Sequence, residues 1–256
     1  MRNKKLMWIA AALVLLILVV SLYNFGSSRI QEKNGTLPEL ELKIYTDSVD
    51  PAARVHAEYF SILGGKPYFI DVGDLNSRMR GFFLHEFTIG FFRNGEGVPQ
   101  PPILNPKASY ESKAGYSIVG NYLSVTRAMT VSDPDSEHPV TTFKAETYNM
   151  RDVHLYRLYE LLQWDNDAQD VFDQAIAEGK CRLVYPERDI PGAVDVLRTC
   201  MADGTWDHGD DYFLTETGVR LFLNERGHEN GDYWLFEIAY EDLGEVRASL
   251  DVVRKS

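Results

Sequence analysis

The chain has 256 residues, of which 45% are hydrophobic and 25% are charged. This composition is typical of a globular protein with a real core, and it excludes a disordered stalk. The formal net charge is −12, from 26 basic and 38 acidic residues. So acidic a surface repels nucleic acid and anionic lipid headgroups, which excludes nucleic-acid binding. A preference for cationic partners and simple solubility both account for the charge.

The most distinctive segment is an uninterrupted apolar run over residues 6–20, preceded by a tail, residues 1–5, with three basic side chains. Continued to residue 25, the run has about 20 residues, enough to cross a bilayer as a helix. The basic tail lies in the cytoplasm by the positive-inside rule, so the rest of the chain lies outside. We therefore expect a single-pass anchor over residues 6–25 in the cell membrane.

A cleaved secretory signal is the alternative to this anchor. Its apolar region normally has about 7–15 residues and ends in a small-x-small cleavage site. Here the run is longer, and only Gly26 and Ser28 offer a poor match to such a site. In either case the remainder is exported. Three of the 26 basic residues lie in the tail, which leaves 23 against 38 acidic residues, a net charge of −15.

The first half after the anchor mixes strand-like and helical patterns. Residues 26–39 read as a polar linker, and residues 40–45 then alternate apolar and polar side chains as in a half-buried strand. Pro51 begins a segment whose apolar side chains recur at helical spacing up to Leu63, which predicts a helix. Strands are predicted over four further segments, residues 68–72, 82–92, 116–131 and 140–148.

The second half contains three predicted helices and then a group of strands. The first helix is marked by the apolar side chains of Leu155, Leu158 and Leu162. The second begins at a capping position in residues 165–167 and ends at Gly179. The third helix covers residues 191–201, and strands are predicted at 212–215, 219–224, 233–240 and 247–253.

Strands and helices are segregated along the chain and do not alternate strictly. This arrangement predicts an α+β fold in which helices pack on an antiparallel sheet, preceded by one N-terminal transmembrane helix. We divide the exported part into an N-terminal α+β half, residues 40–135, and a C-terminal half, residues 136–256.

Cys181 and Cys200 are the two cysteines of the chain. Conditions outside the membrane are often oxidising, so we expect one disulfide between them. Closing a loop of about 19 residues would stabilise the fold by on the order of 3 kcal/mol. Two buried thiols in a reducing setting are the alternative.

Two blocks of the second half carry a resemblance to a known family. The first is residues 142–150, and the second is residues 212–222 followed by residues 236–243. Together they resemble the RsiV-like (PdaC-like) extracytoplasmic domain of unknown function. That domain forms the ectodomain of a lysozyme-sensing anti-sigma factor and lies beside the catalytic domain of a peptidoglycan deacetylase. The resemblance covers about residues 139–246 and implies a binding or sensing role outside the membrane.

The chain departs from this family in two loops. Relatives often carry Gly-Gly-Ala-His before the first block, where this chain has residues 132–138, three of which are acidic. Relatives commonly have Pro-Tyr after the central strand, where this chain has residues 224–228. Both loops lie at ligand-facing positions, so the ligand of the family is not carried over.

Familiar catalytic and metal-binding motifs are missing from the sequence. His85 and Glu86 begin like a zinc-protease helix, but Ile89 stands where the second histidine is needed. Residues 165–176 begin like a calcium loop, yet they lack its central glycine and its final glutamate. We therefore expect no resident metal, no cofactor and no catalysis.

The densest polar cluster of the chain precedes a predicted strand. Its members are Trp206, Asp207, His208, Asp210 and Asp211. Carboxylates around a histidine suit a divalent metal or, beside an aromatic anchor, a basic partner, while an exposed acidic turn is the alternative. We take these residues and the loop residue His228 as candidate ligand contacts.

These features predict a membrane-anchored, extracytoplasmic binding or sensing module without catalysis of its own. Its partner would be a protein or a cell-wall component, with cationic partners favoured. A cell-wall hydrolase or deacetylase with an unrecognised site, and a structural subunit of an envelope complex, are the alternatives. A five-residue tail is too short for a sigma-binding segment, so we do not expect direct anti-sigma signalling.

Overall fold

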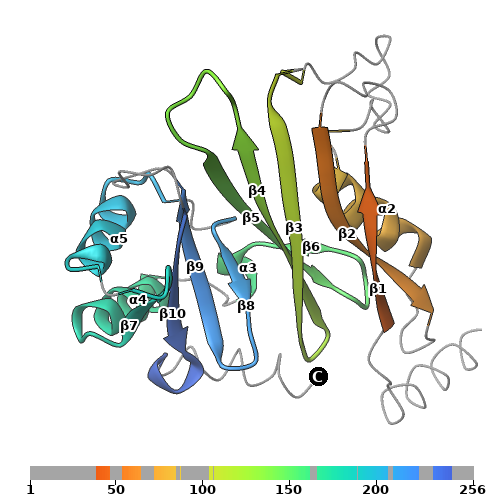
Figure 1. The fold of residues 1–256 in the computed structure, drawn as a ribbon. Coiled ribbons are helices and arrows are strands. Elements are labelled where there is room, and N and C mark those ends of the chain that lie inside the picture. The colour runs from red at the N-terminus through yellow and green to blue at the C-terminus, as the bar shows by residue number, and fades with distance from the viewer. Residues whose placement is uncertain are drawn as a thin grey trace, which may run out of the picture.

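The computed structural model describes residues 39–46, 54–64, 72–84, 87, 104–105, 107–161, 166–188, 190–206, 210–224 and 233–243. The anchor expected at residues 6–25, the linker before residue 39 and the strand expected at residues 247–253 lie outside these ranges. None of the described helices is long and apolar enough to span a membrane. Within the described ranges the fold is α+β, as the sequence predicts, with two sheets and several helices (Figure 1).

The larger sheet has six strands, and their order in the sheet follows their order in the chain. The strands are β1 (Glu39–Tyr45), β2 (Arg54–Gly64), β3 (Ser109–Val119), β4 (Tyr122–Ser132), β5 (Val140–Asn149) and β6 (Leu155–Tyr156). Neighbouring strands are antiparallel except β2 and β3, which are parallel. Parallel neighbours need a long crossover, and α2 (Val72–Leu84) lies in that connection.

The smaller sheet has four antiparallel strands in the order β7-β10-β9-β8. The strands are β7 (Cys181–Tyr185), β8 (Tyr212–Leu214), β9 (Gly218–Asn224) and β10 (Tyr233–Ala239). The helices of this half are α3 (Leu158–Leu161), α4 (Asn166–Ala177), α5 (Ala193–Ala202) and the short 3-10 helix η1 (Tyr240–Asp242). In Figure 1, α4 and α5 lie beside the smaller sheet, and α2 lies at the opposite end of the molecule.

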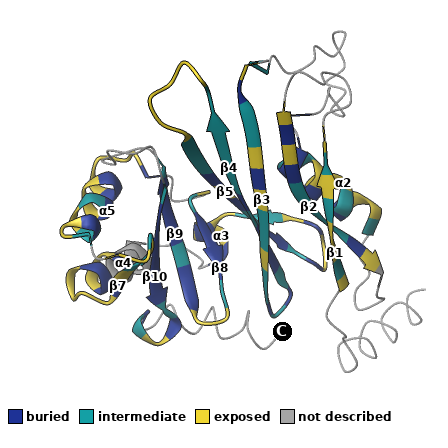
Figure 2. Ribbon diagram, viewed as in Figure 1, coloured by how far each residue is buried: buried dark blue, intermediate teal, exposed yellow. Residues whose placement is uncertain are grey.

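Three hydrophobic clusters join these layers, and the buried stripes of Figure 2 follow them. Because side chains alternate along a strand, Leu123 and Val125 of β4 face α2, while Phe143 and Ala145 of β5 face the smaller sheet. Between the sheets, the ring of Phe143 lies 5.0 Å from that of Phe222. The opposite face of the smaller sheet packs on α4 and α5.

Polar contacts also tie the two sheets together. The Ser117 hydroxyl of β3 donates to the carbonyl of Leu214 in β8, and the Leu214 N–H donates to the Ser124 hydroxyl of β4 over 3.1 Å. β4 and β5 pair along ten positions, so the boundary placed between residues 135 and 136 falls in the loop of a hairpin within one sheet.

The helix predicted from Pro51 to Leu63 is wrong, because residues 54–64 form β2. The segment is rich in β-branched and aromatic side chains, and it pairs with β1 on one side and β3 on the other. Val55 and Ala57 are buried by strand alternation, whereas Val55, Tyr59 and Leu63 also stand at helical spacing. The sequence allowed both a helical and a strand spacing of its apolar residues, and pairing with β1 and β3 selected the strand.

The strand predicted at residues 82–92 is also wrong where the structure describes it, because Phe82 to Leu84 end α2. The buried side chains Leu75, Met79 and Phe83 are four residues apart and form one helical face. The strand predicted over residues 116–131 is two strands, β3 and β4, joined at Gly120, whose φ is 58°. Strand β7 has no counterpart among the sequence predictions.

Seven of the described elements agree with the sequence predictions. β1, β5, α4, α5, β8, β9 and β10 form close to their expected positions. The first helix of the second half begins later than expected, because Leu155 belongs to β6; the described helical residues of this segment are Leu158–Leu161.

Candidate ligand-binding cavity

The outer edge of β5 is only partly covered by its neighbour. β6 pairs with β5 at Thr147 and Tyr148 alone, so within the described residues no strand covers β5 from Val140 to Glu146. The side chain of Asn224 in β9 bonds to part of this uncovered edge. Its Oδ1 accepts the Phe143 N–H over 2.7 Å, and its Nδ2 donates to the Phe143 carbonyl over 2.9 Å.

A cavity of about 600 Å³ opens along this uncovered edge. Its walls come from both faces of β5, so it lies where α2, the larger sheet and the smaller sheet meet. The lining residues are Arg78, Gly81, Phe82, Arg127, Phe143, Lys144, Ala145, Glu146, Thr147, Tyr148, Leu155, Tyr156, Asp210, Asp211, Tyr212, Phe222 and Asn224. A volume of this size suits a small organic ligand.

Glu146 and Tyr148 form a hydrogen-bonded pair of titratable side chains in the cavity. They are two residues apart on one strand and therefore share a face, and the Tyr148 hydroxyl donates to Glu146 Oε2. Burial raises the pKa of Glu146, and Asp210 adds to the rise, while Tyr148, Arg127 and Arg78 oppose it; the net pKa is raised. Burial and the neighbouring Glu146 raise the pKa of Tyr148 as well.

Arg127 supplies positive charge from the interior of the cavity. Its side chain is 1% exposed and its Nη1 donates to the Phe83 carbonyl of α2 over 3.2 Å. Its guanidinium carbon also lies 5.8 Å from the centre of the Phe82 ring, within cation–π range. Arg78 of α2 is exposed and forms an ion pair of 3.1 Å with Asp74.

Tyr156 forms part of the rim, and its position is fixed from several sides. The Tyr212 hydroxyl donates to the Tyr156 carbonyl over 2.7 Å, and burial raises the pKa of that hydroxyl. The Tyr156 ring meets those of Tyr122 and His154 edge-on, at 5.4 and 4.8 Å. The turn before it holds Val153 at a φ of 59°, a strained value for a β-branched residue.

The polar cluster predicted at residues 206–211 is divided by the structure. Asp210 and Asp211 line the cavity, and Asp210 Oδ1 lies 3.7 Å from Arg157 Nε. Trp206 is 1% exposed and packs in the core of the smaller sheet, so it is a core residue and not a surface anchor. Asp207 and His208 lie outside the described residues.

Two other candidates of the sequence, both cysteines, do not line the cavity. Cys181 at the start of β7 and Cys200 in α5 are both buried and both free thiols, so the expected disulfide is not formed in this structure. Burial raises the pKa of the Cys181 thiol to about 12, which makes it a poor nucleophile. His228 lies outside the described residues.

No group of three or more His, Cys, Asp or Glu side chains that could hold a metal occurs among the residues that the structure describes. The cavity instead gathers the cationic side chains of Arg78, Arg127 and Lys144 with the carboxylates of Glu146, Asp210 and Asp211. Aromatic side chains line the same cavity. Such a lining can bind a polar ligand that carries both positive and negative groups.

Sequence reasoning missed most of these side chains. Glu146 and Tyr148 lie inside the block that resembles the RsiV-like family, but their two-residue spacing was not interpreted as a shared face. Arg127 gave a clearer signal. It follows Leu123 and Val125 at alternate positions of β4, so a charged side chain stands where the strand pattern places a buried apolar one. Arg78 could not be found, because α2 itself was not predicted.

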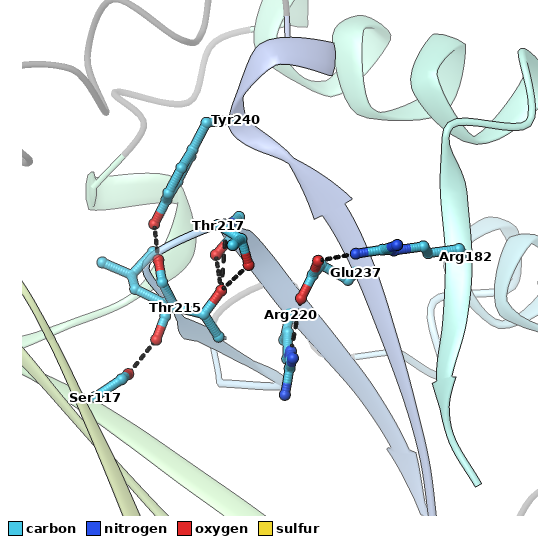
Figure 3. A network of polar contacts seen from close by, with 9 residues as sticks. Ser117, Arg182, Thr215, Thr217, Arg220, Glu237 and Tyr240 are labelled. Atoms are coloured by element: carbon cyan, nitrogen blue, oxygen red, sulfur yellow. Dashed lines mark hydrogen bonds and ion pairs between the residues drawn. The ribbon is translucent and has the colours of Figure 1, made fainter. Parts of the chain in front are cut away.

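A second polar cluster lies on the smaller sheet, outside the cavity (Figure 3). Glu237 of β10 is 2% exposed, and its two oxygens accept hydrogen bonds from Arg182 over 2.6 Å and Arg220 over 2.9 Å. Burial alone raises the pKa of Glu237, but the two guanidinium groups outweigh it, and the net pKa is lowered. The same figure shows the Tyr240 hydroxyl donating to the Thr215 carbonyl over 2.8 Å, which fixes the turn before β9. Both contacts stabilise the sheet that carries Asn224.

No family model and no curated protein matches this chain. Among solved structures, a crystal structure of a DUF3298 family protein from Pseudomonas aeruginosa is similar to it, with a TM-score of 0.48 and 11% sequence identity. The similarity covers 82% of this chain and 94% of that chain. It is a likeness of chain trace between two proteins that share about one residue in nine.

Proposed function

We propose that this chain is a membrane-anchored, extracytoplasmic binding module of the RsiV-like type, without catalysis of its own. Its ligand occupies the cavity at the β5 edge. The observation that carries the proposal is the meeting of guanidinium, carboxylate and aromatic side chains in a cavity of about 600 Å³. The apolar run at residues 6–25 supports the anchor, and the basic tail before it supports the orientation.

The charges of the cavity favour one class of ligand. The chain as a whole has a net charge of −12, whereas the lining offers three cationic and three acidic side chains. A ligand with both amino and carboxyl groups on a polar scaffold matches this balance better than a purely cationic one. Outside the membrane, a soluble cell-wall fragment made of amino sugars and short peptides has this chemistry. Basic proteins remain the alternative partner suggested by net charge.

One observation favours a second function, a cell-wall hydrolase. Glu146 has a raised pKa and is influenced by the charge of Asp210 across the cavity. Glycoside hydrolysis uses two carboxyl groups, one of them with a raised pKa. In the binding module the same carboxyl serves as a hydrogen-bond donor or acceptor for the ligand.

A calorimetric titration distinguishes these functions. The full chain in detergent solution is titrated with a purified disaccharide-peptide fragment of the cell wall, and separately with a basic protein. Two cavity variants, Glu146→Gln and Arg78→Ala, are compared with Glu178→Gln, a substitution of the same kind at an exposed residue in the turn after α4. We expect the fragment to bind, both cavity variants to bind at least about tenfold more weakly, and Glu178→Gln to bind like the parent.

The fragment recovered after titration is analysed by mass spectrometry. An unchanged fragment agrees with a binding module. Turnover of the fragment that disappears in Glu146→Gln would establish the hydrolase instead. If only the basic protein binds tightly, and the cavity variants do not weaken that binding, the binding site lies elsewhere on the surface.

A further inference from the structure

The edge strand β1 carries features of a contact surface. It ends the six-stranded sheet, and within the described part of the chain no other strand pairs with its outer side. An edge strand presents a row of main-chain N–H and C=O groups that can pair with another strand. With seven residues, β1 is long enough for such pairing.

Large apolar side chains are concentrated here. Leu42 is 49% exposed and Ile44 is 60% exposed, and Leu63 at the end of the neighbouring β2 is 56% exposed. These are three of the six exposed large hydrophobic side chains of the described residues. Exposed apolar groups gathered on one edge indicate a surface that is covered by a partner.

The sequence of β1 is complementary to itself. If two copies pair antiparallel with Leu42 opposite the partner's Leu42, Glu41 lies opposite the partner's Lys43 and Lys43 opposite the partner's Glu41. The same register puts Leu40 opposite the partner's Ile44. Opposite charges and paired aliphatic side chains across antiparallel strands both stabilise a sheet.

We propose that the chain forms a symmetric homodimer in which the β1 strands of two copies pair antiparallel about Leu42. The two six-stranded sheets then become one continuous sheet, and the contact is closed because the same strand is used by both copies. This inference goes beyond the proposed ligand binding and does not depend on it.

The proposed anchors are compatible with this dimer. The starts of the two β1 strands lie at opposite ends of the pair, about 20–25 Å apart. Each strand follows the proposed anchor after 13 residues, 26–38, which can extend to about 45 Å. Both copies can therefore reach one membrane, and tethering there raises their effective concentration.

Cysteine cross-linking tests the register in the full chain, solubilised in detergent and mildly oxidised. In a Leu42→Cys variant the two new thiols face each other, with Cα atoms about 5 Å apart, which suits a disulfide. In the matched control Ile44→Cys they are displaced by four residues, about 13 Å, which a disulfide cannot span. The native cysteines are buried. We expect a covalent dimer for Leu42→Cys and none for Ile44→Cys.

Charge reversal provides the second test, read as the dimer dissociation constant by analytical ultracentrifugation. Glu41→Lys and Lys43→Glu each put two like-charged pairs across the contact, and we expect each to weaken the dimer by about tenfold. The double variant Glu41→Lys/Lys43→Glu restores opposite charges in the same register, so its dissociation constant returns to that of the parent. A chain that remains monomeric, equal cross-linking of both cysteine variants, or a double variant no stronger than the singles would overturn the proposal.

Discussion

The pKa of Glu146 is raised by the surroundings of its side chain. Its carboxyl is partly enclosed by α2 and the β5 edge, and burial disfavours the charged form. Asp210 raises the pKa further, whereas Arg127 and Arg78 lower it, so the cavity balances opposing influences. A ligand that brings its own charge into the cavity shifts this balance, and ligand binding should therefore depend on pH.

Replacing Glu146 by Gln should change how stability depends on pH. A raised native pKa means that the folded state holds the proton more tightly than the unfolded chain, so the free energy of unfolding falls as pH rises through that window. Glutamine does not ionise and still accepts the Tyr148 hydroxyl. We expect Glu146→Gln and the parent to have similar melting temperatures below about pH 4, and the variant to be the more stable one at pH 7.

Glu178→Gln provides the control for this prediction, again by melting temperature across pH. Hydrogen bonding to Lys180, then to Gln174, lowers the pKa of Glu178, which is exposed in the turn after α4. Its contribution therefore has the opposite sign and is lost as pH falls. A Glu146→Gln variant that gains nothing over the parent between pH 4 and pH 7 would contradict the account of Glu146.

Substitutions in the Glu237 cluster should lower the free energy of unfolding by different amounts. Arg220 is 34% exposed and its guanidinium also lies 6.0 Å from the Phe213 ring, while Arg182 is 70% exposed. A more exposed partner contributes less, because water screens it and solvates it when the pair is broken. By urea unfolding we expect Glu237→Gln to lose about 1–3 kcal/mol, and Arg220→Ala to lose more than Arg182→Ala.

The sign of the Glu237 effect with pH is opposite to that of Glu146. Its native pKa is lowered, so its stabilising contribution is present above the usual range of a glutamate and is lost as pH falls through the native pKa. The difference between the parent and Glu237→Gln should therefore shrink in acid. Equal losses for Arg182→Ala and Arg220→Ala would show that exposure does not govern this cluster.

At the scale of elements, the junction of the sheets depends on Asn224. One amide group satisfies both main-chain groups of Phe143, as a neighbouring strand would. Asn224→Ala leaves these groups without that partner and should cost about 1–3 kcal/mol of unfolding free energy. Asn224→Asp places a carboxylate against the Phe143 carbonyl, so we expect a larger loss at pH 7.

Acid should rescue the aspartate and not the alanine variant. A protonated carboxyl regains a donor for the Phe143 carbonyl, so the unfolding free energy of Asn224→Asp should approach that of the parent near pH 3–4. Urea unfolding at the two pH values measures this. Parallel changes in both variants would mean that the paired hydrogen bonds are not what holds the sheets here.

In the elements that were predicted correctly, the spacing of apolar residues and the flanking turn residues favour one type of secondary structure. In β5 and β10 the apolar side chains and the flanking turn residues indicate a strand, and the segment of α4 is followed by Gly179, whose φ is 72°. The segment of β2 fits a helical and a strand pattern equally, and its pairing with β1 and β3 decides the outcome. α2 was missed because its aromatic residues Phe82 and Phe83 have high strand propensity.

The candidate site could be found from sequence only in part. Asp210 and Asp211 were singled out because they are neighbours in the chain, and local clusters are visible in a sequence. Glu146, Arg127 and Arg78 come from β5, β4 and α2, and only the crossover and the strand order bring them together. Trp206 was misread for the same reason, since its burial depends on α4, α5 and the smaller sheet.

At the scale of the whole molecule, the cavity lies where three packed layers meet. α2 covers one face of the larger sheet, the smaller sheet covers the other, and the short β6 leaves the edge between them open. A ligand there touches all three layers and should make them more rigid together. The dimer contact proposed at β1 lies at the opposite edge of the same sheet, so the two surfaces do not compete.

Hydrogen–deuterium exchange of the full chain, with and without the soluble cell-wall fragment, tests the central claim most directly. Among the residues that the structure describes, no strand pairs with one side of residues 140–146, and a ligand in the cavity should slow the exchange of their amides. We predict that protection on adding the fragment appears in peptides covering residues 140–149, 155–157 and 210–212, and not in α4 or α5. Protection confined to other regions, or none at a fragment concentration that saturates binding, would contradict the assignment of the β5 edge as the ligand-binding site.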